Sequence, residues 1–569
     1  MARIIPVLLL LLPLAACTGP ESAHRTPAAS GDDAATGDAA APAQRRESGP
    51  YDTAHTPAEP GPASPEQPQT VRETGAGALD GHLVQMSAPR RPVDRENYAH
   101  FDDNPVKRAA EQPVSTFSVD VDTGAYANVR RFLNDGRLPR TDAVRTEELI
   151  NYFDYKYAVP ADRERPFGVA TAVARTPWND DTHLVQVGIQ GWQPTGEPPP
   201  ANLVFLIDVS GSMRSPDKLS LLKSAMKLLV KQLDAEDRVS IAVYAGAAGA
   251  VLEPTPGDRH AQITAAIDNL RAGGSTNGGA GIHLAYSMAQ QAFIDDGINR
   301  VILASDGDFN VGTADFQTLV DLVAEKRASD VALTTLGFGT GNYNDRLVEQ
   351  LSNKGNGNYA YIDNLSEARR VLVDNHAATL QTIAKDVKIQ IEFNPASVAE
   401  YRLIGYENRQ LAREDFNNDN VDAGEIGAGH TVTALYEIAL VGSGGERMDP
   451  LRYGSGDTPA GGDTDELAFL RLRYKAPGGD TSRLIEQPIE RDAIRPLAEA
   501  GDDLRFAAAV AGFGQLLRGG QYTGDFGHSE VLELARTARG TDADGRRGEF
   551  LQLVQLAQAL DTFQPEAGD

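Results

Sequence analysis

The sequence contains a single cysteine, Cys17, among its 569 residues. One cysteine can form neither an intrachain disulfide nor a zinc site built from several thiolates. The 10 histidines show no HExxH or similar zinc-ligand spacing, and the chain has no GxSxG nucleophile elbow. These absences exclude several catalytic and structural classes, and we expect a protein that is not an enzyme.

Basic residues are also in short supply. The 53 Lys and Arg face 80 Asp and Glu, which gives a formal net charge of -27. Nucleic-acid phosphates and bare anionic membranes repel such a chain. We therefore expect no nucleic-acid partner. The charge suits cations, or proteins that carry basic patches.

The N-terminus is typical of a targeting segment. Residues 4–14 form an apolar run after Arg3, too short to span a bilayer but typical of a signal-peptide core. The sequence Leu14-Ala15-Ala16-Cys17 then resembles the lipobox of bacterial lipoproteins. This resemblance implies a signal peptide over residues 1–16 and a lipidated Cys17; the alternative is an ordinary cleavage site beside a chance cysteine. In a diderm bacterium, Thr18 after the cysteine implies sorting to the outer membrane.

Residues 17–95 are rich in Ala, Pro, Gly, Ser, Thr and Glu, and Tyr51 is their only aromatic residue. Such a segment cannot bury enough apolar area to offset the loss of chain entropy, so we expect it to be disordered. A flexible chain of this length has a root-mean-square span of about 50 Å. We interpret it as a tether that holds the folded part away from a lipid surface.

Three folded regions are expected after the tether. Residues 96–200 form an N-terminal β-rich module, with strand-like alternation at 169–173 and 185–189 and a helix at 146–153. Residues 381–565 form a C-terminal α+β module that begins with alternation at 387–393. Because both flanks are strand-rich, we expect them to pack together, so that the region between them is an insertion. We also expect them to attach at the amino ends of its strands and to leave the opposite face free.

Residues 201–380 alternate strands with helices, which predicts a doubly wound α/β domain with a mostly parallel sheet. Residues 203–207 are a continuous apolar run, as expected of a central parallel strand. Residues 218–233 form an amphipathic helix, for which Ser215 and Pro216 are a suitable N-cap and first residue.

Oxygen-bearing side chains follow the first strand of this domain. Asp208, Ser210 and Ser212 offer a carboxylate and two hydroxyls from one turn, and Gly211 lets that turn bend tightly. Ligands of open α/β sheets bind beyond the carboxyl ends of strands. Hard oxygen donors favour Mg²⁺, Mn²⁺ or Ca²⁺. Thr276, in a glycine-rich loop, and Asp306, after the strand at 301–304, add two more donors.

Together these residues resemble the von Willebrand factor type A (vWA) domain and its metal-ion-dependent adhesion site. The family pattern, Asp-x-Ser-x-Ser followed by Thr and then Asp, matches Asp208, Ser210, Ser212, Thr276 and Asp306 without departure. The resemblance implies a Rossmann-like fold and one Mg²⁺-type ion, which the hydroxyls bind directly or through water. It further implies that a protein partner's Asp or Glu can replace one bound water. The alternative is that these residues only cap helices.

The order of the segments resembles a bacterial family of vWA lipoproteins over residues 96–565. The resemblance rests on the lipobox, the tether, the vWA domain and the flanking stretches 120–123, 147–153, 415–425 and 433–437. It implies a location in the cell envelope, at the outer membrane or periplasm of a diderm bacterium. Membrane contact is expected through the lipid anchor only.

Two further acidic motifs give weaker signals. Asp120-x-Asp122 resembles the phosphotransfer pair of haloacid-dehalogenase-like enzymes, but capping of a helix near residue 125 by Asp122 and Thr123 is the simpler interpretation. Asp415 to Asp422 resembles a calcium loop, yet Asn420 stands where glycine is needed, so a solvated turn is the favoured interpretation.

The leading hypothesis is a lipid-anchored module that binds a protein partner through the divalent ion. A first alternative is a metal-dependent or enzyme-assisting protein, for which Asp308 is the one candidate general base near the site. A second alternative is a structural scaffold in which the ion only stabilises the fold.

Overall fold

The computed structural model describes residues 95–196, 198–274, 278–308, 316–449 and 465–563. The predicted signal peptide, Cys17 and almost all of the predicted tether lie outside these ranges. Within them, no helix has the length and apolar character that crossing a membrane requires.

The α/β domain contains a six-stranded sheet in the order β10-β9-β8-β5-β6-β7. Five strands are parallel, and β7 pairs antiparallel with β6 at the edge. The bounds are β5 Ala201–Asp208, β6 Arg238–Tyr244, β7 Ala248–Pro256, β8 Ile298–Ser305, β9 Ala332–Phe338 and β10 Tyr359–Ile362. Every residue of β5 and β8 is buried, which explains the continuous apolar runs.

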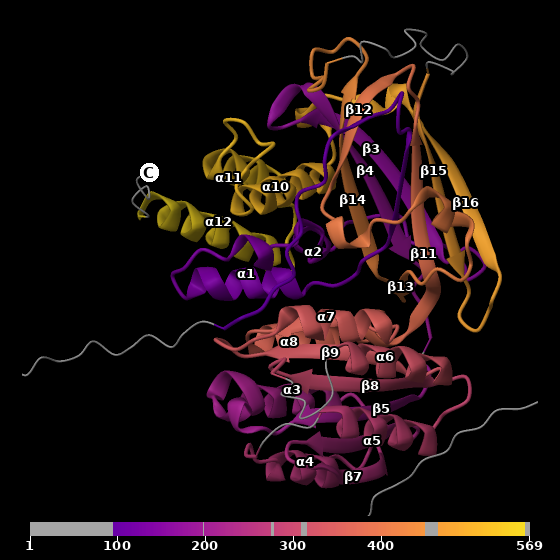
Figure 1. The fold of residues 1–569 in the computed structure, drawn as a ribbon, viewed down its shortest axis with the longest axis vertical. Helices are drawn as coiled ribbons and strands as arrows, with labels where there is room; N and C mark the ends of the chain where they lie inside the picture. The colour runs from indigo at the N-terminus through magenta and orange to yellow at the C-terminus, as the bar shows by residue number, and fades with distance from the viewer. Residues whose placement is uncertain (1–94, 197, 275–277, 309–315, 450–464, 564–569) are drawn as a thin grey trace, which may run out of the picture. The chain divides into compact units, whose positions relative to one another are not determined.

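Helices cover both faces of this sheet, so the predicted doubly wound fold is confirmed (Figure 1). One apolar core joins the sheet to α3, α4 and α8, and a second joins it to α5, α6 and α7. The bounds are α3 Leu221–Val230, α4 His260–Asn269, α5 Gly278–Gln291, α6 Phe316–Lys326, α7 Asp345–Lys354 and α8 Leu365–Arg369.

The start of the helix predicted at residues 218–233 is wrong. The regular helix α3 begins at Leu221, and Pro216–Ser220 forms a wider turn in which Lys218 has non-helical angles (φ -118°, ψ -107°). Ser215 makes no side-chain capping bond. The physical reason is a tertiary contact: Lys218 donates a hydrogen bond to the buried carboxylate of Asp306, and its backbone departs from helical angles.

The flanking segments form two sheets, antiparallel except for the pair of β17 with β3, and each sheet draws strands from both sides of the α/β domain. One has the order β1-β12-β14-β4-β3-β17; the other has β13-β11-β15-β16, with β2 also paired to β11. The pairing of β4 with β14 confirms that the flanks pack together and that the α/β domain is inserted between them. The two predicted modules therefore share one β-sandwich, whose core contains side chains from both sheets. The bounds are β1 Lys107–Arg108, β2 Val114–Ser118, β3 Phe167–Thr176, β4 Asn179–Gly191, β11 Thr382–Phe393, β12 Val398–Ile404, β13 Gly424–Gly427, β14 Thr431–Leu440, β15 Glu466–Lys475, β16 Ser482–Glu490 and β17 Ile494–Arg495.

Helices from both ends of the described chain form a further layer against this sandwich (Figure 1). Their core contains a group of aromatic rings: Phe153 makes edge-to-face contacts with Phe506 and Phe550, at centroid distances of 4.9 and 5.8 Å. The bounds are α1 Gly124–Asn134, α2 Thr146–Asn151, α10 Asp502–Leu517, α11 His528–Thr537 and α12 Arg546–Phe563.

The flanks also reach the carboxyl edge of the α/β sheet, so their predicted restriction to the amino ends is wrong. The Arg95 N–H donates to the Gly341 carbonyl (2.8 Å), and Asn97 forms a parallel bridge with Asn344. Residues 341–344 follow the carboxyl end of β9. Along the β10 edge, Arg130 of α1 forms ion pairs with Asp363 (2.6 Å) and Glu367 (2.8 Å).

Candidate metal centre

Asp208 is the last residue of β5 and is fully buried. Its Oδ1 accepts a hydrogen bond from the Ser210 N–H (2.8 Å), and its Oδ2 accepts one from the Ser305 hydroxyl (3.1 Å). The hydroxyls of Ser210 and Ser212 lie 2.9 Å apart. One short turn therefore brings the first carboxylate and both serine oxygens together.

Asp306 follows the neighbouring strand β8 and is also fully buried. Its Oδ1 accepts from the Asp308 N–H (3.1 Å), while its Oδ2 accepts from Lys218 Nζ (2.9 Å) and Asn342 Nδ2 (3.1 Å). Because β5 and β8 are adjacent parallel strands, their ends place Asp208 and Asp306 at the same edge of the sheet.

The glycine-rich loop reaches the same edge. The Gly273 N–H donates to the Val209 carbonyl (2.7 Å), and the Gly211 N–H donates to the Gly274 carbonyl (3.2 Å). Thr276, two residues further on, lies outside the described residues. The described part of the loop is thus fixed to the turn that carries Ser210 and Ser212.

The two carboxylates affect each other. Burial, with a further contribution from the charge of Asp306, raises the pKa of Asp208 to about 6. Two neighbouring buried carboxylates are costly unless a cation offsets their charge. Among the described residues, no cluster of three or more His, Cys, Asp or Glu is suited to hold a metal. A metal bound here would depend on hydroxyl oxygens, which Ser210 and Ser212 offer.

Lys218 is a member of this site that the sequence reasoning missed. Its ammonium donates to Asp306 and also to Asn342 Oδ1 (2.7 Å), and its side chain is buried. Gly339 leaves room for it, because a Cβ at Gly339 would lie 2.1 Å from Lys218 Cε. The sequence signal was that Lys218 precedes Leu222 by four residues and so falls on the apolar side of the predicted helix.

Asp308, the candidate base of the enzymatic alternative, is half-buried. Its Oδ2 accepts a hydrogen bond from Asn342 Nδ2 (3.3 Å), and its backbone N–H supports Asp306. These contacts give Asp308 a role in orienting the loop.

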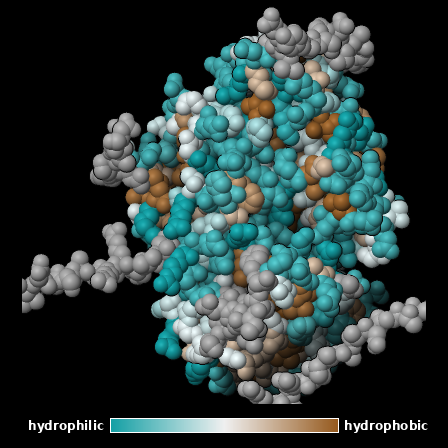
Figure 2. All heavy atoms as spheres, viewed as in Figure 1, coloured by the Kyte–Doolittle hydropathy of each residue, from teal (hydrophilic) through white to brown (hydrophobic). Residues whose placement is uncertain are grey.

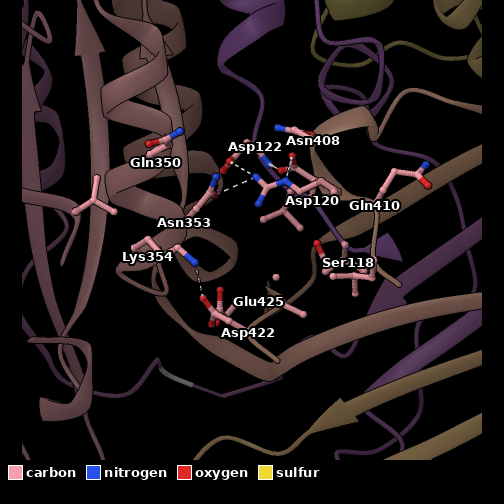
Figure 3. A pocket seen from close by; sticks show the side chains of 18 of the residues that line it. Ser118, Asp120, Asp122, Gln350, Asn353, Lys354, Asn408, Gln410, Asp422 and Glu425 are labelled. Carbon is pink, nitrogen blue, oxygen red and sulfur yellow. Dashed lines mark hydrogen bonds and ion pairs between the residues drawn. The ribbon is translucent and has the colours of Figure 1, made fainter. Parts of the chain in front are cut away.

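The pair Asp120 and Asp122 lies in a different pocket, at the junction of the α/β domain and the β-sandwich (Figure 3). Arg409 pairs with Asp120 (2.8 Å) and Asp122 (3.2 Å). Asp122 also accepts the N–H of Tyr359 at the start of β10 (2.7 Å). The predicted capping role of Asp122 and Thr123 is wrong, because α1 has no side-chain N-cap bond and Thr123 accepts from Arg370 instead. These residues join the two parts of the protein.

The acidic residues of the calcium-like loop do not converge on one point. Asp419 pairs with Arg473 (3.1 Å), whereas Asp422 pairs with Arg327 and with Lys354 (3.5 Å). Asp415 accepts the N–H of Ala412 (3.1 Å). Each carboxylate therefore has its own protein partner, as the favoured interpretation of a turn requires.

The parallel sheet and the residues at its carboxyl edge define a vWA-domain protein. The family model "von Willebrand factor type A domain" matches residues 203–308, "von Willebrand factor" matches 92–186, and "Uncharacterized protein YfbK, C-terminal" matches 378–560. The chain belongs to the YfbK family: it is 49% identical over 471 residues to "Uncharacterized protein YfbK" of Escherichia coli (strain K12), a match that covers 81% of each protein.

Other similarities are more restricted. "Uncharacterized protein sll0103" of Synechocystis is 33% identical over 171 residues, which cover 30% of this chain and 39% of that protein. Human inter-alpha-trypsin inhibitor heavy chain H3 is 24% identical over 267 residues, 42% of this chain and 29% of that protein. The solved structure "von Willebrand factor type A from Catenulispora acidiphila" aligns over 68% of this chain and 89% of its own, with 15% identity and a TM-score of 0.40.

Proposed function

We propose that the chain is a lipid-anchored cell-envelope protein whose vWA domain holds one divalent cation and binds a protein partner through it. Mg²⁺ is the preferred ion, with Mn²⁺ and Ca²⁺ as substitutes. The observation that carries the proposal is that two fully buried carboxylates, Asp208 and Asp306, end adjacent parallel strands beside two serine hydroxyls.

The described donors suit a hard cation. Asp208 and Asp306 supply negative charge, and backbone N–H groups hold one oxygen of each in place. Ser210 and Ser212 supply neutral oxygens, and the motif assigns a third to Thr276. A bound Mg²⁺ would attract a further oxygen ligand, such as the carboxylate of a partner's Asp or Glu.

The net charge of the protein supports a role for the divalent cation in partner binding. With a net charge of -27, the protein repels an acidic partner at long range, so the cation has to supply the local attraction. On the face drawn in Figure 2, hydrophilic residues predominate and hydrophobic ones are scattered.

The envelope location follows from the lipobox resemblance of residues 14–17. We expect mass spectrometry of the mature N-terminal peptide to show a diacylglyceryl group on Cys17. We also expect Cys17→Ser to release the protein from the membrane fraction. A wild-type N-terminus without lipid would contradict the anchor but leave the metal proposal standing.

The functional test compares capture of envelope proteins in Mg²⁺ and in EDTA. We expect Mg²⁺-dependent capture by the wild type and none by Asp208→Ala or Thr276→Ala. Thr276→Ala removes a single neutral donor and therefore disturbs the fold least. Asp258→Ala, in a half-exposed loop, is the matched control and should behave as wild type. Capture that is equal in Mg²⁺ and EDTA would contradict the proposal.

A further inference from the structure

A cavity of about 430 Å³ lies at the amino ends of β8 and β9, the end of the sheet opposite the candidate metal centre. Both connections between the α/β domain and the β-sandwich line it: Pro199 on the way in, and residues 380–382 on the way out. Its volume is within the range of ligand pockets, about 300–1,000 Å³, and far above that of one water.

Arg300 of β8 contributes a buried guanidinium to this cavity and is only 2% exposed. Its Nη1 donates to Thr334 Oγ1 (2.6 Å), and its Nη2 donates to the Leu380 carbonyl (3.1 Å). Its Nε has no hydrogen-bond partner within the described protein, and no ion pair joins Arg300 to a described carboxylate within 4 Å. Burial lowers the pKa of Arg300 to about 10, against an opposing contribution from the charge of Glu425, so the group remains charged at neutral pH. A buried guanidinium with an unpaired N–H favours an anionic or strongly polar ligand.

Two other unpaired polar atoms line the same cavity. Gln381 Oε1 and Glu425 Oε1 are buried and have no hydrogen-bond partner within the described protein. Burial, together with nearby Asp422 and Asp386, raises the pKa of Glu425 to about 8. Its carboxyl group is therefore largely neutral at pH 7, so it can donate a hydrogen bond and repels an anion little.

The remaining charged groups of the cavity are mostly paired. Arg327 pairs with Asp422, and Lys385 lies 3.7 Å from Asp330. Arg163 is exposed at the cavity, where it adds a cation without a structural role in the core. Arg300 is thus the buried cation of the cavity, and the exposed side chains of Arg163 and Asp296 also line it.

We propose that this cavity binds a small oxyanion, a carboxylate or a phosphate, through the guanidinium of Arg300. Gln381 accepts a hydrogen bond from a protonated or hydroxyl-bearing part of the ligand. The site is separate from the metal centre, because the six residue steps from Arg300 to Asp306 extend over about 20 Å of chain. Since both connections line the cavity, its ligand contacts the α/β domain and the sandwich together.

Isothermal titration calorimetry of the full chain tests this with two probes, inorganic phosphate and succinate, at matched ionic strength in NaCl. We expect saturable binding of at least one probe, and the comparison identifies which oxyanion the site prefers. EDTA should leave this binding unchanged, which separates it from the proposed metal site. Failure of both probes to bind the wild type would overturn the proposal.

Single substitutions identify which residues bind the oxyanion. Arg300→Met should weaken binding at least tenfold, and Arg163→Met, which changes an exposed side chain, should weaken it severalfold without affecting the fold. Arg175→Met, the same change at an exposed position of β3, is the matched control. Glu425→Gln keeps a neutral donor and should retain binding. Binding by Arg163→Met and Arg300→Met as tight as that of the wild type would also overturn the proposal.

Discussion

Lys218 Nζ lies 2.9 Å from Asp306 Oδ2, and both side chains are buried at the carboxyl edge of the sheet. The ammonium thus offsets one of the two carboxylates that we assign to the metal centre. Lys218 comes from the irregular turn before α3, and Asp306 from the end of β8. The candidate site therefore combines a fixed monovalent cation with oxygen donors that we propose bind a divalent one.

Replacing Lys218 should raise the affinity for the divalent ion. In Lys218→Met the site has one more uncompensated negative charge, so we expect Mn²⁺ or Mg²⁺ to bind several-fold more tightly by calorimetry. In EDTA the same variant should lose about 3 kcal/mol of unfolding free energy, because a buried carboxylate is left without its partner. Lys231→Met, on the exposed side of the same region, should change neither quantity. Unchanged ion affinity in Lys218→Met would show that the ammonium does not influence the site.

Substitution of Gly339 tests whether the Lys218 side chain needs the space beside this glycine. A Cβ at Gly339 would lie 2.1 Å from Lys218 Cε, and the residue has a φ of +81°. Gly341→Ala is a close control, because Gly341 has a φ of +85° but nothing within 4 Å of a Cβ. Both variants should lose about 1 kcal/mol from backbone strain. Only Gly339→Ala should lose more and also change the ion affinity, as measured by thermal unfolding and calorimetry. Equal effects of the two variants would refute the steric role.

Glu367 should make stability depend on pH. Burial by itself would raise the pKa of this carboxyl, but the charges of Arg370 and Arg130 prevail and lower it from 4.5 to about 2. A carboxyl with a depressed pKa stabilises the folded state fully above pH 4.5, and this contribution is lost as the pH falls from 4.5 to 2. Its size is about 3 kcal/mol at 1.36 kcal/mol per pKa unit.

Urea unfolding between pH 7 and pH 2.5 measures this dependence. Glu367→Gln should be less stable than the wild type at pH 7, and the difference should shrink on acidification. Glu325→Gln, an exposed control on α6, should follow the wild-type curve. A pH-independent difference between Glu367→Gln and the wild type would contradict the assignment.

Arg409 should hold the α/β domain against the β-sandwich. It pairs with Asp120 and Asp122 of the sandwich side and donates to Asn353 of α7 (2.9 Å). Figure 3 shows Asp120, Asp122 and Asn353 close together in the junction pocket. Arg409→Met leaves two buried carboxylates unpaired, so we expect a loss of about 3–5 kcal/mol in unfolding free energy.

Limited proteolysis should then detect loosening at the junction. We expect faster cleavage of Arg409→Met near Pro199 or residues 380–382, the two connections of the inserted domain. The exposed Arg413→Met is the matched control and should be cleaved like the wild type. Wild-type cleavage rates in Arg409→Met would show that other contacts suffice to hold the domains.

Some elements could be predicted because their causes are local. The apolar run at 203–207 is a buried central strand, and the alternation at 387–393 lies within β11, which pairs with β2 and β15. The start of α3 and the roles of Asp122 and Thr123 could not be predicted in this way. At each of these positions the local sequence favours a capped helix. In the structure the side chain contacts a distant residue instead: Lys218 contacts Asp306, Asp122 contacts Tyr359, and Thr123 contacts Arg370.

The sequence alone determined the alternation of strands and helices, and hence which edge of the sheet carries Asp208 and Asp306. It could do so because hydrophobic periodicity fixes the elements and parallel strands all end at one edge. Only the tertiary structure decided that Lys218 and Asn342 reach Asp306, that the two flanks share one sandwich, and that Arg300 lines a cavity without an ion pair to any described carboxylate. These features depend on contacts between side chains of distant segments, which form only when the chain packs. Local sequence patterns do not predict such contacts.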